Sequence, residues 1–150
     1  MKRETEIFKN SDYRFFNMAR QIAEQSDFGS TKVGCVLVYQ GKILATGCNT
    51  TKTSPIQKRY NRFRHFNPGV KPIQHSNHAE LAAIKSVSYT VDKEIDWKRV
   101  KVYVFRIAPG LPLGMGCAKP CPGCMALIRD KGIRDVYYSD NDGYCYQRIV

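Results

Sequence analysis

The stretch KVGCVLVYQGKILATGCN, residues 32–49, holds two runs rich in Val, Ile and Leu that are separated by Gln40 and Gly41. Two such runs joined by a two-residue turn that contains glycine are typical of a β-hairpin. We therefore expect one strand from Lys32 to Tyr39 and a second from Lys42 to Asn49.

The segment before this hairpin has the pattern of an amphipathic helix. From Ser11 to Gly29, the apolar residues recur every three or four positions, which places them on one face of a helix. They are Phe15, Met18, Ala19, Ile22 and Ala23. Ser11 is predicted to cap the start of this helix and Gly29 to mark its end.

Helical and extended patterns alternate after the hairpin. The segment from Thr50 to Ser76 contains three prolines and no sustained period, so we predict a long loop with little regular structure. The residues beyond it predict a helix at 78–87, a strand at 100–107, a glycine-rich connection at 109–116, a helix from 121 to just before 132, and strands at 133–139 and 144–149.

This order of elements predicts an α/β layered domain in which helices cover a mixed sheet. Only eleven residues follow Ser139, fewer than a parallel crossover requires, so the last two strands are predicted to form an antiparallel hairpin. At 150 residues, the chain is predicted to be a single domain over 1–150, with a loop insertion at about 50–76.

Two short motifs carry candidate chemistry. Cys121 and Cys124 form a C-x-x-C pair at the start of a predicted helix, where two thiolates can face one ion. His78-Ala79-Glu80 begins another helix, and H-x-E followed by P-C-x-x-C is the signature of zinc nucleobase deaminases. Three protein ligands leave the fourth position of the zinc open for water. We predict that His78, Cys121 and Cys124 bind one Zn²⁺ per chain and that Glu80 is the general acid and base.

The same residues allow other interpretations. Asn77 and Glu80 fit a helix capping box, and His75 with His78 and the two cysteines fits a closed structural Cys2His2 zinc site. Cys117 adds a C-x3-C-x2-C spacing of the iron–sulfur type, although such enzymes need a much larger barrel. The run from Asp140 to Gly143 resembles the opening of a calcium loop, but it lacks the glutamate at the twelfth position and is predicted to be a turn.

With these motifs, the sequence resembles the cytidine and deoxycytidylate deaminase superfamily, which also includes tRNA adenosine deaminases. The similarity runs from about Ser11 to Ser139 and is specific at TGCN (46–49), HAE (78–80) and PCPGC (120–124). The resemblance implies a three-layer cytidine deaminase-like fold with a mixed five-stranded sheet and helices on both faces. It also implies hydrolytic deamination of a cytosine-containing nucleoside or nucleotide, of the cytidine or CMP/dCMP type, to the uracil product and ammonia.

The resemblance extends to individual residues. Asn49 is expected to contact the sugar or base of the substrate, Ala79 to offer its backbone N–H to the pyrimidine carbonyl, and Pro120 to lie in the substrate site. Cys35 is expected to be a core residue of its strand. Family members commonly form homo-oligomers, so we expect one here. The predicted C-terminal hairpin is more typical of the cytidine and blasticidin deaminases than of the deoxycytidylate and tRNA types.

The charge of the chain favours anionic partners. Twenty-four Lys and Arg against thirteen Asp and Glu give a net charge of +11. The 50–76 loop has six basic residues, no acidic residue and three aromatic residues, a mixture that suits a phosphate and a stacked base. Arg59, Arg62 and Arg64 are therefore predicted to bind substrate phosphate. Two alternatives stay open: a nucleic-acid deaminase acting on tRNA adenosine or single-stranded cytosine, and a non-catalytic zinc module that binds nucleic acid.

The compartment is predicted from what the sequence lacks. No stretch approaches the roughly 18 apolar residues of a membrane-spanning helix, and the N-terminus lacks the apolar region of a signal peptide. We therefore expect a cytoplasmic protein with no membrane partner, in which the six cysteines stay reduced.

Overall fold

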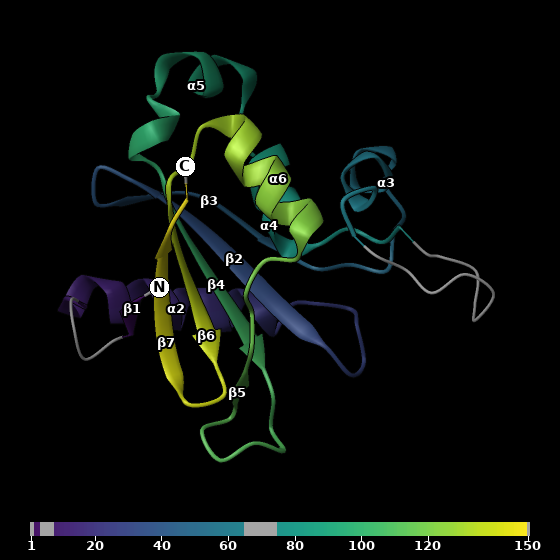
Figure 1. The fold of residues 1–150 in the computed structure, drawn as a ribbon, viewed down its shortest axis with the longest axis vertical. Coiled ribbons are helices and arrows are strands. Elements are labelled where there is room, and N and C mark those ends of the chain that lie inside the picture. The colour runs from purple at the N-terminus through teal and green to yellow at the C-terminus, as the bar shows by residue number, and fades with distance from the viewer. Residues whose placement is uncertain (1, 4–7, 65–74, 150) are drawn as a thin grey trace.

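A single mixed sheet organises the protein, with helices on both of its faces (Figure 1). The computed structural model describes residues 2–3, 8–64 and 75–149. The strands are β1 (Lys2–Arg3), β2 (Lys32–Tyr39), β3 (Lys42–Cys48), β4 (Lys101–Ile107), β5 (Met115–Gly116), β6 (Asp135–Asp140) and β7 (Gly143–Arg148). The helices are α2 (Asn10–Ala23), α3 (Pro55–Asn61), α4 (Ala79–Lys85), α5 (Tyr89–Glu94), the 3-10 helix η1 (Trp97–Arg99) and α6 (Pro122–Lys131).

The sheet has the strand order β1-β7-β6-β4-β2-β3, and β5 pairs with β4. All five predicted strands are present, and the two-residue strands β1 and β5 bring the number in this sheet to seven. β6 runs parallel to β4, whereas β7 is antiparallel to β6. The predicted C-terminal hairpin is thus confirmed, and Asn141 and Asp142 form its turn.

Two apolar cores lie on opposite faces of the sheet, as the alternation of side chains along a strand requires. On β2, Cys35 and Leu37 pack in the core beneath α4 and α6, whereas Val36 and Val38 pack against α2. Cys35 is fully buried, as expected. The three-layer α/β fold is therefore confirmed.

Two glycines allow the helices to approach the sheet closely. A Cβ atom at Gly34 on β2 would lie 2.1 Å from the carbonyl oxygen of Ala19 in α2, and one at Gly47 on β3 would lie 2.3 Å from the amide nitrogen of Ala83 in α4. Any larger residue at these positions would therefore push a helix away from the sheet.

The predicted bounds of the first helix were wrong at both ends. The helix begins at Asn10 and has Lys9 as its N-cap residue, whose N–H donates to Asp12 Oδ2 at 2.9 Å, so Ser11 lies inside the helix. It ends at Ala23 rather than Gly29. Beyond it, Ser26 Oγ donates to the carbonyl oxygen of Asn49 at 2.8 Å, and this tertiary contact draws the chain toward the end of β3.

The prediction that the 50–76 segment has little regular structure was also wrong. This segment contains α3, which begins after Ser54 and has Pro55 in its first turn, both favoured at a helix start. The helix escaped detection because its buried residues, Gln57 and Asn61, are polar, and its core-facing apolar residues, Ile56 and Tyr60, form a pair only one turn long. Residues 65–74 of the predicted loop lie outside the described residues.

The short helices α5 and η1 were not predicted either. Neither contains a buried residue, so the apolar periodicity that indicates a helix is missing from their sequences. None of the helices in the described ranges is long and apolar enough to cross a membrane.

Candidate metal centre

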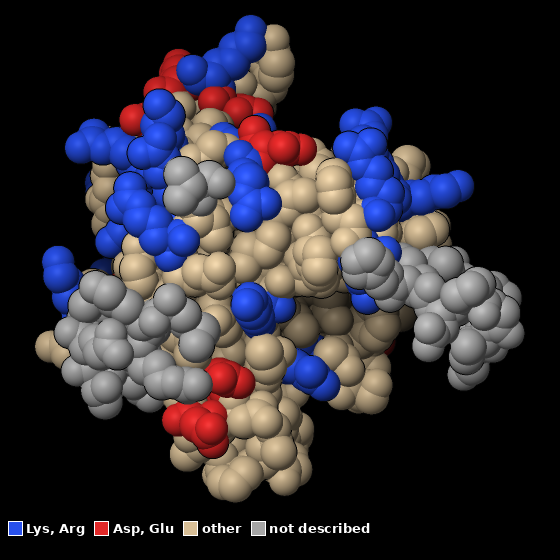
Figure 2. All heavy atoms as spheres, viewed as in Figure 1, with Lys and Arg blue, Asp and Glu red and all other residues tan. Residues whose placement is uncertain are grey.

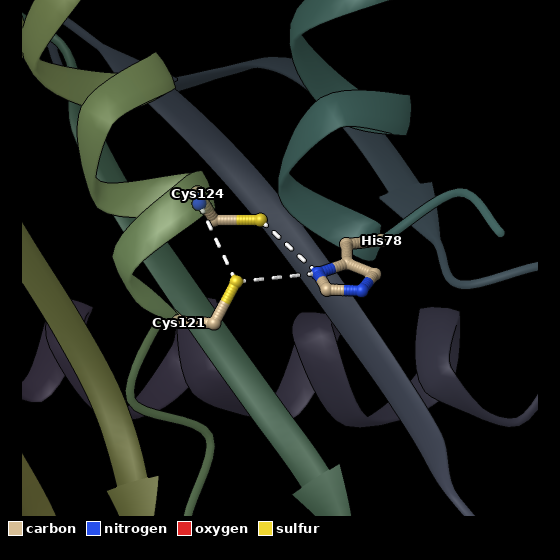
Figure 3. A group of neighbouring side chains, drawn as sticks. All are labelled: His78, Cys121 and Cys124. Carbon is tan, nitrogen blue, oxygen red and sulfur yellow. Dashed lines mark hydrogen bonds between the residues drawn. The ribbon is translucent and has the colours of Figure 1, made fainter. Parts of the chain in front are cut away.

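Three potential metal ligands meet between the start of α4 and the start of α6. The ligand atoms of His78, Cys121 and Cys124 all lie within 4.8 Å of one another. His78 Nδ1 is 3.2 Å from Cys124 Sγ and 3.6 Å from Cys121 Sγ, and both sulfurs face the imidazole (Figure 3). The structure thus brings together the three residues that the two sequence motifs predict.

The two helix starts determine how these side chains are presented. Cys121 is the N-cap residue of α6, and its sulfur accepts the backbone N–H of Cys124 at 3.4 Å. Pro122 follows in the first turn, where its fixed φ favours the helix. His78 is the N-cap residue of α4 and has an extended backbone. All three ligands therefore belong to the first turn or the cap of a helix.

The geometry fits a tetrahedral zinc ion. With Zn–S bonds of about 2.3 Å and Zn–N bonds of about 2.0–2.1 Å, adjacent sulfur and nitrogen ligands of a tetrahedral site lie about 3.6 Å apart. The two S···N distances here are 3.2 and 3.6 Å. Two thiolates and one imidazole form a donor set that zinc favours, and they leave one coordination position open.

The side chains of this group shift one another's pKa values. Hydrogen bonds with Cys124 and His78 lower the pKa of the Cys121 thiol to about 4, although burial opposes this shift. Burial lowers the pKa of His78, but its hydrogen bond with Cys121 and the charge of Glu80 outweigh burial and raise the pKa. A metal that binds here must displace the imidazole proton, so its affinity should fall in acid.

Glu80 lies one residue into α4 and is only 5% exposed. Burial raises the pKa of its carboxyl group, whereas the charge of His78 lowers it. Asn77 and Glu80 do not form the capping box that the sequence allowed, because the N-cap of α4 is His78 and no side-chain cap bond is made there. The carboxyl group instead accepts a hydrogen bond from the Cys124 thiol, which places it beside the candidate metal ligands.

The closed Cys2His2 site is not formed. His75 Nδ1 lies 2.9 Å from Asn61 Nδ2, and His75 does not belong to the ligand group among the described residues. Cys117, the additional cysteine of the iron–sulfur spacing, is exposed and does not join that group either. The group of possible ligands found in the described part of the chain thus has three members.

Asn49 follows β3 directly and is 8% exposed. Its side-chain Oδ1 accepts the N–H of Val33 at 2.9 Å, and Nδ2 donates to the carbonyl oxygen of Thr31 at 2.8 Å. Asn49 therefore ties the end of β3 to the start of β2. A side-chain amide has a second N–H and a second lone pair.

The other two predicted pocket residues lie beside the metal ligands. Ala79 is buried in the first turn of α4, where backbone N–H groups have no partner within the helix. Pro120 is buried and immediately precedes Cys121. Both positions are compatible with the roles expected from the resemblance.

The three arginines of the basic segment are placed differently. Arg64 Nη1 lies 3.5 Å from His78 Nε2, on the side of the imidazole away from the sulfurs. Arg59 and Arg62 are exposed, and the Arg62 guanidinium lies 4.7 Å from the ring centre of Phe63. Figure 2 shows Lys and Arg side chains gathered at the position of α3. Of the three, Arg64 is thus placed beside a candidate metal ligand.

Two buried residues of α3 were missed by the sequence reasoning. Gln57 is 1% exposed and its Oε1 accepts the backbone N–H of His78 at 3.1 Å, and Asn61 is 2% exposed. The Ser54-Pro55 pair was the signal that could have located α3, but nothing in the sequence indicated that its polar residues point inward.

Comparison with known proteins identifies the class to which this arrangement belongs. The family model of the cytidine and deoxycytidylate deaminase zinc-binding region matches residues 9–140. The chain therefore belongs to the cytidine and deoxycytidylate deaminase family of zinc-dependent hydrolytic enzymes. A search of curated proteins finds no match.

Solved structures confirm the fold. The dCMP deaminase of cyanophage S-TIM5 in apo form matches with a TM-score of 0.54 and 21% identity, covering 89% of this chain and 86% of that chain. The same enzyme in complex with dCMP and dUMP has a TM-score of 0.54 and 20% identity, with coverages of 89% and 85%. A cytidine deaminase from Burkholderia pseudomallei matches with a TM-score of 0.59 and 17% identity, covering 94% and 93%.

Proposed function

We propose that this protein hydrolyses the amino group of a cytosine-containing nucleoside or nucleotide and releases the uracil product and ammonia. The observation that carries this proposal is the ligand group of His78, Cys121 and Cys124, whose ligand atoms lie within 4.8 Å of one another, next to the buried Glu80. A three-ligand site with a neighbouring carboxyl group suits hydrolysis better than a purely structural role.

The protein side of the reaction follows from these positions. A zinc ion held by the three ligands would lower the pKa of a water molecule to near 7. Glu80 would accept a proton from a water molecule and deliver it to the ring nitrogen while the water oxygen bonds to the neighbouring carbon. It would then carry the remaining proton of that oxygen to the amino group, so that the C–N bond breaks, the carbonyl of the uracil product forms and ammonia leaves. The raised pKa of Glu80 suits a group that must both accept and donate a proton near neutral pH.

Substrate orientation would come from Ala79, Asn49 and Pro120. The N–H of Ala79 is proposed to donate to the pyrimidine carbonyl, and the remaining donor and acceptor capacity of the Asn49 amide to contact the sugar. Pro120 would line the pocket next to Cys121. Two hydrogen bonds already fix the orientation of the Asn49 amide. Ala79 and Pro120 are buried and directly follow or precede a candidate metal ligand in the chain.

Arg64 is proposed to bind the phosphate of a nucleotide substrate. A guanidinium group only donates hydrogen bonds, so its contact with His78 Nε2 requires this nitrogen to be an acceptor. When Nδ1 binds a metal, the proton of the neutral imidazole resides on Nε2, and the contact becomes one between two donors. Metal binding should therefore weaken the contact between Arg64 and His78, and the guanidinium would then donate to the substrate phosphate.

The surface of α3 supports a second candidate, deamination of a base within single-stranded nucleic acid. Arg59 and Arg62 are exposed on or next to α3, and Phe63 is 42% exposed with Arg62 stacked over its ring. Exposed aromatic rings beside cations bind single strands through stacking and phosphate contacts. This surface lies next to Arg64, which contacts the candidate metal ligand His78.

The decisive experiment measures ammonia release by zinc-loaded protein. The substrates are cytidine, deoxycytidine, CMP, dCMP, adenosine and single-stranded oligonucleotides that contain cytosine or adenine. We expect turnover of a cytosine compound. Turnover only within oligonucleotides would select the nucleic-acid candidate. Full zinc loading with no turnover of any substrate would contradict both and would instead identify a zinc-stabilised binding module.

A further inference from the structure

The inward side of α3 carries two buried polar side chains beside the partly buried Ile56 and Tyr60. Gln57 and Asn61, one turn apart, are 1% and 2% exposed, and Gln57 Nε2 donates to Asn61 Oδ1 at 2.9 Å. Burying a polar side chain destabilises a protein unless each buried group finds a hydrogen-bond partner. The hydrogen-bond partners of Gln57 and Asn61 therefore indicate which part of the chain this amide pair positions.

Both ends of the amide pair contact the histidine segment. Gln57 Oε1 accepts the backbone N–H of His78 at 3.1 Å, and Asn61 Nδ2 donates to His75 Nδ1 at 2.9 Å. The chain of hydrogen bonds thus runs from His78 through Gln57 and Asn61 to His75. It holds the backbone of one histidine and the side chain of the other.

The helix that carries this pair is itself fixed to the helix that carries the two thiols. Tyr60 Oη donates to Asp130 Oδ2 of α6 at 2.8 Å. At Gly123, between the two cysteines, an added Cβ atom would lie 2.7 Å from the carbonyl oxygen of Tyr60. In Figure 1, α3 lies to one side of α6, with which it is in contact. One short helix therefore contacts both halves of the ligand group.

We propose that Gln57 is a positioning residue for the metal centre, with Asn61 holding its amide in place. Gln57 fixes the backbone of His78 so that Nδ1 faces the two sulfurs, and the bond from Asn61 to His75 holds the second histidine outside the ligand group. This inference rests on the proposed function only in requiring that the three ligands bind zinc.

The test is zinc affinity, measured by competition with a chromogenic chelator. Gln57→Met keeps the length of the side chain but removes the acceptor for the His78 N–H, and we expect zinc affinity to fall about 10- to 100-fold, as is usual for groups that orient a metal ligand. Gln57→Glu keeps an oxygen acceptor for the His78 N–H but loses the donor to Asn61 Oδ1, so its affinity should lie between those of the wild type and Gln57→Met. The matched control is Gln21→Met on the exposed side of α2, which should bind zinc like the wild type.

A graded series separates positioning from general destabilisation. Zinc affinity should fall most in Gln57→Met, less in Asn61→Leu, and little in His75→Ala, because Asn61 can then donate to water. If Gln57→Met does not fold, as judged by circular dichroism, Gln57→Asn shortens the reach by one carbon and should show the same loss. Wild-type affinity in a folded Gln57→Met or Gln57→Asn protein would overturn the proposal.

The outcomes for the two proposals are distinct. Normal zinc affinity without Gln57, together with ammonia release by the wild type, would overturn the positioning role and leave the enzymatic function intact. Weakened zinc binding in Gln57→Met, together with zinc-loaded wild-type protein that deaminates nothing, would support the positioning role and overturn the function.

Discussion

Replacing Glu80 should reduce turnover, whereas replacing His75 should affect neither turnover nor zinc content much. Glu80→Gln keeps the shape of the side chain but removes the proton carrier, so turnover should fall at least ~10²-fold while zinc content stays normal. His75→Ala should change zinc content little, because His75 lies outside the ligand group. Metal analysis and steady-state kinetics on the two variants test this. Loss of zinc from His75→Ala with full activity of Glu80→Gln would instead support a closed structural site.

Arg64 should separate phosphorylated from unphosphorylated substrates. Hydrogen bonds to charged groups contribute about 1.5–3 kcal/mol, so Arg64→Ala should raise KM for a nucleotide about tenfold or more and leave KM for the bare nucleoside nearly unchanged. Arg62→Ala should have a smaller effect, since Arg62 stacks on Phe63 rather than facing His78. Arg20→Ala, on the exposed side of α2, is the control. Equal effects on nucleotide and nucleoside would show that Arg64 does not bind phosphate.

At the scale of elements, the contact between α2 and β2 depends on Gly34. The Cβ atom of Gly34→Ala would lie 2.1 Å from the Ala19 carbonyl oxygen and 2.5 Å from the Ala23 amide nitrogen. Because both are backbone atoms, α2 must shift, and we expect a loss of about 3 kcal/mol in the free energy of unfolding. Urea denaturation measures this loss. Gly29→Ala, with no atom within 4 Å of the added Cβ, should stay within about 1 kcal/mol of the wild type.

The helix α3 lies in a segment whose sequence predicts no regular structure. A segment with three prolines and many charges is expected to be an irregular loop, yet Ser54 and Pro55 start a helix there. The helix is held by hydrogen bonds in addition to the packing of Ile56 and Tyr60 against the core. The exposed side of α3 is thus a candidate phosphate-binding surface, and its buried side contacts the backbone of His78.

For the whole molecule, the net charge of +11 should make association with nucleic acid dependent on salt. If single-stranded oligonucleotides bind at α3, the logarithm of their affinity should fall linearly with the logarithm of salt concentration. Arg59→Ala together with Arg62→Ala should make this slope shallower by about 0.7 for each phosphate contact removed. Fluorescence anisotropy at several salt concentrations measures both. An unchanged slope in the double variant would place the binding surface elsewhere.

Much of this architecture could be predicted because the signals are local. The hairpin of β2 and β3, the strands β4, β6 and β7, and the starts of α4 and α6 all follow from apolar periods and turn residues within a few positions. The antiparallel end of the sheet was predictable because too few residues separate the last two apolar runs for a parallel crossover. His78, Cys121 and Cys124 were recognisable because metal binding restricts residue type and spacing, which are visible in a sequence.

What the tertiary structure alone decided is which polar groups are paired with one another. Asn49 joins two strand ends, and Gln57 and Asn61 bind the histidine segment. It also decided that His78, but not His75, faces the sulfurs. A sequence indicates burial through apolar periodicity. A buried amide has no such periodicity, because its place is set by a hydrogen-bond partner far along the chain, and this partner is known only once the chain has folded.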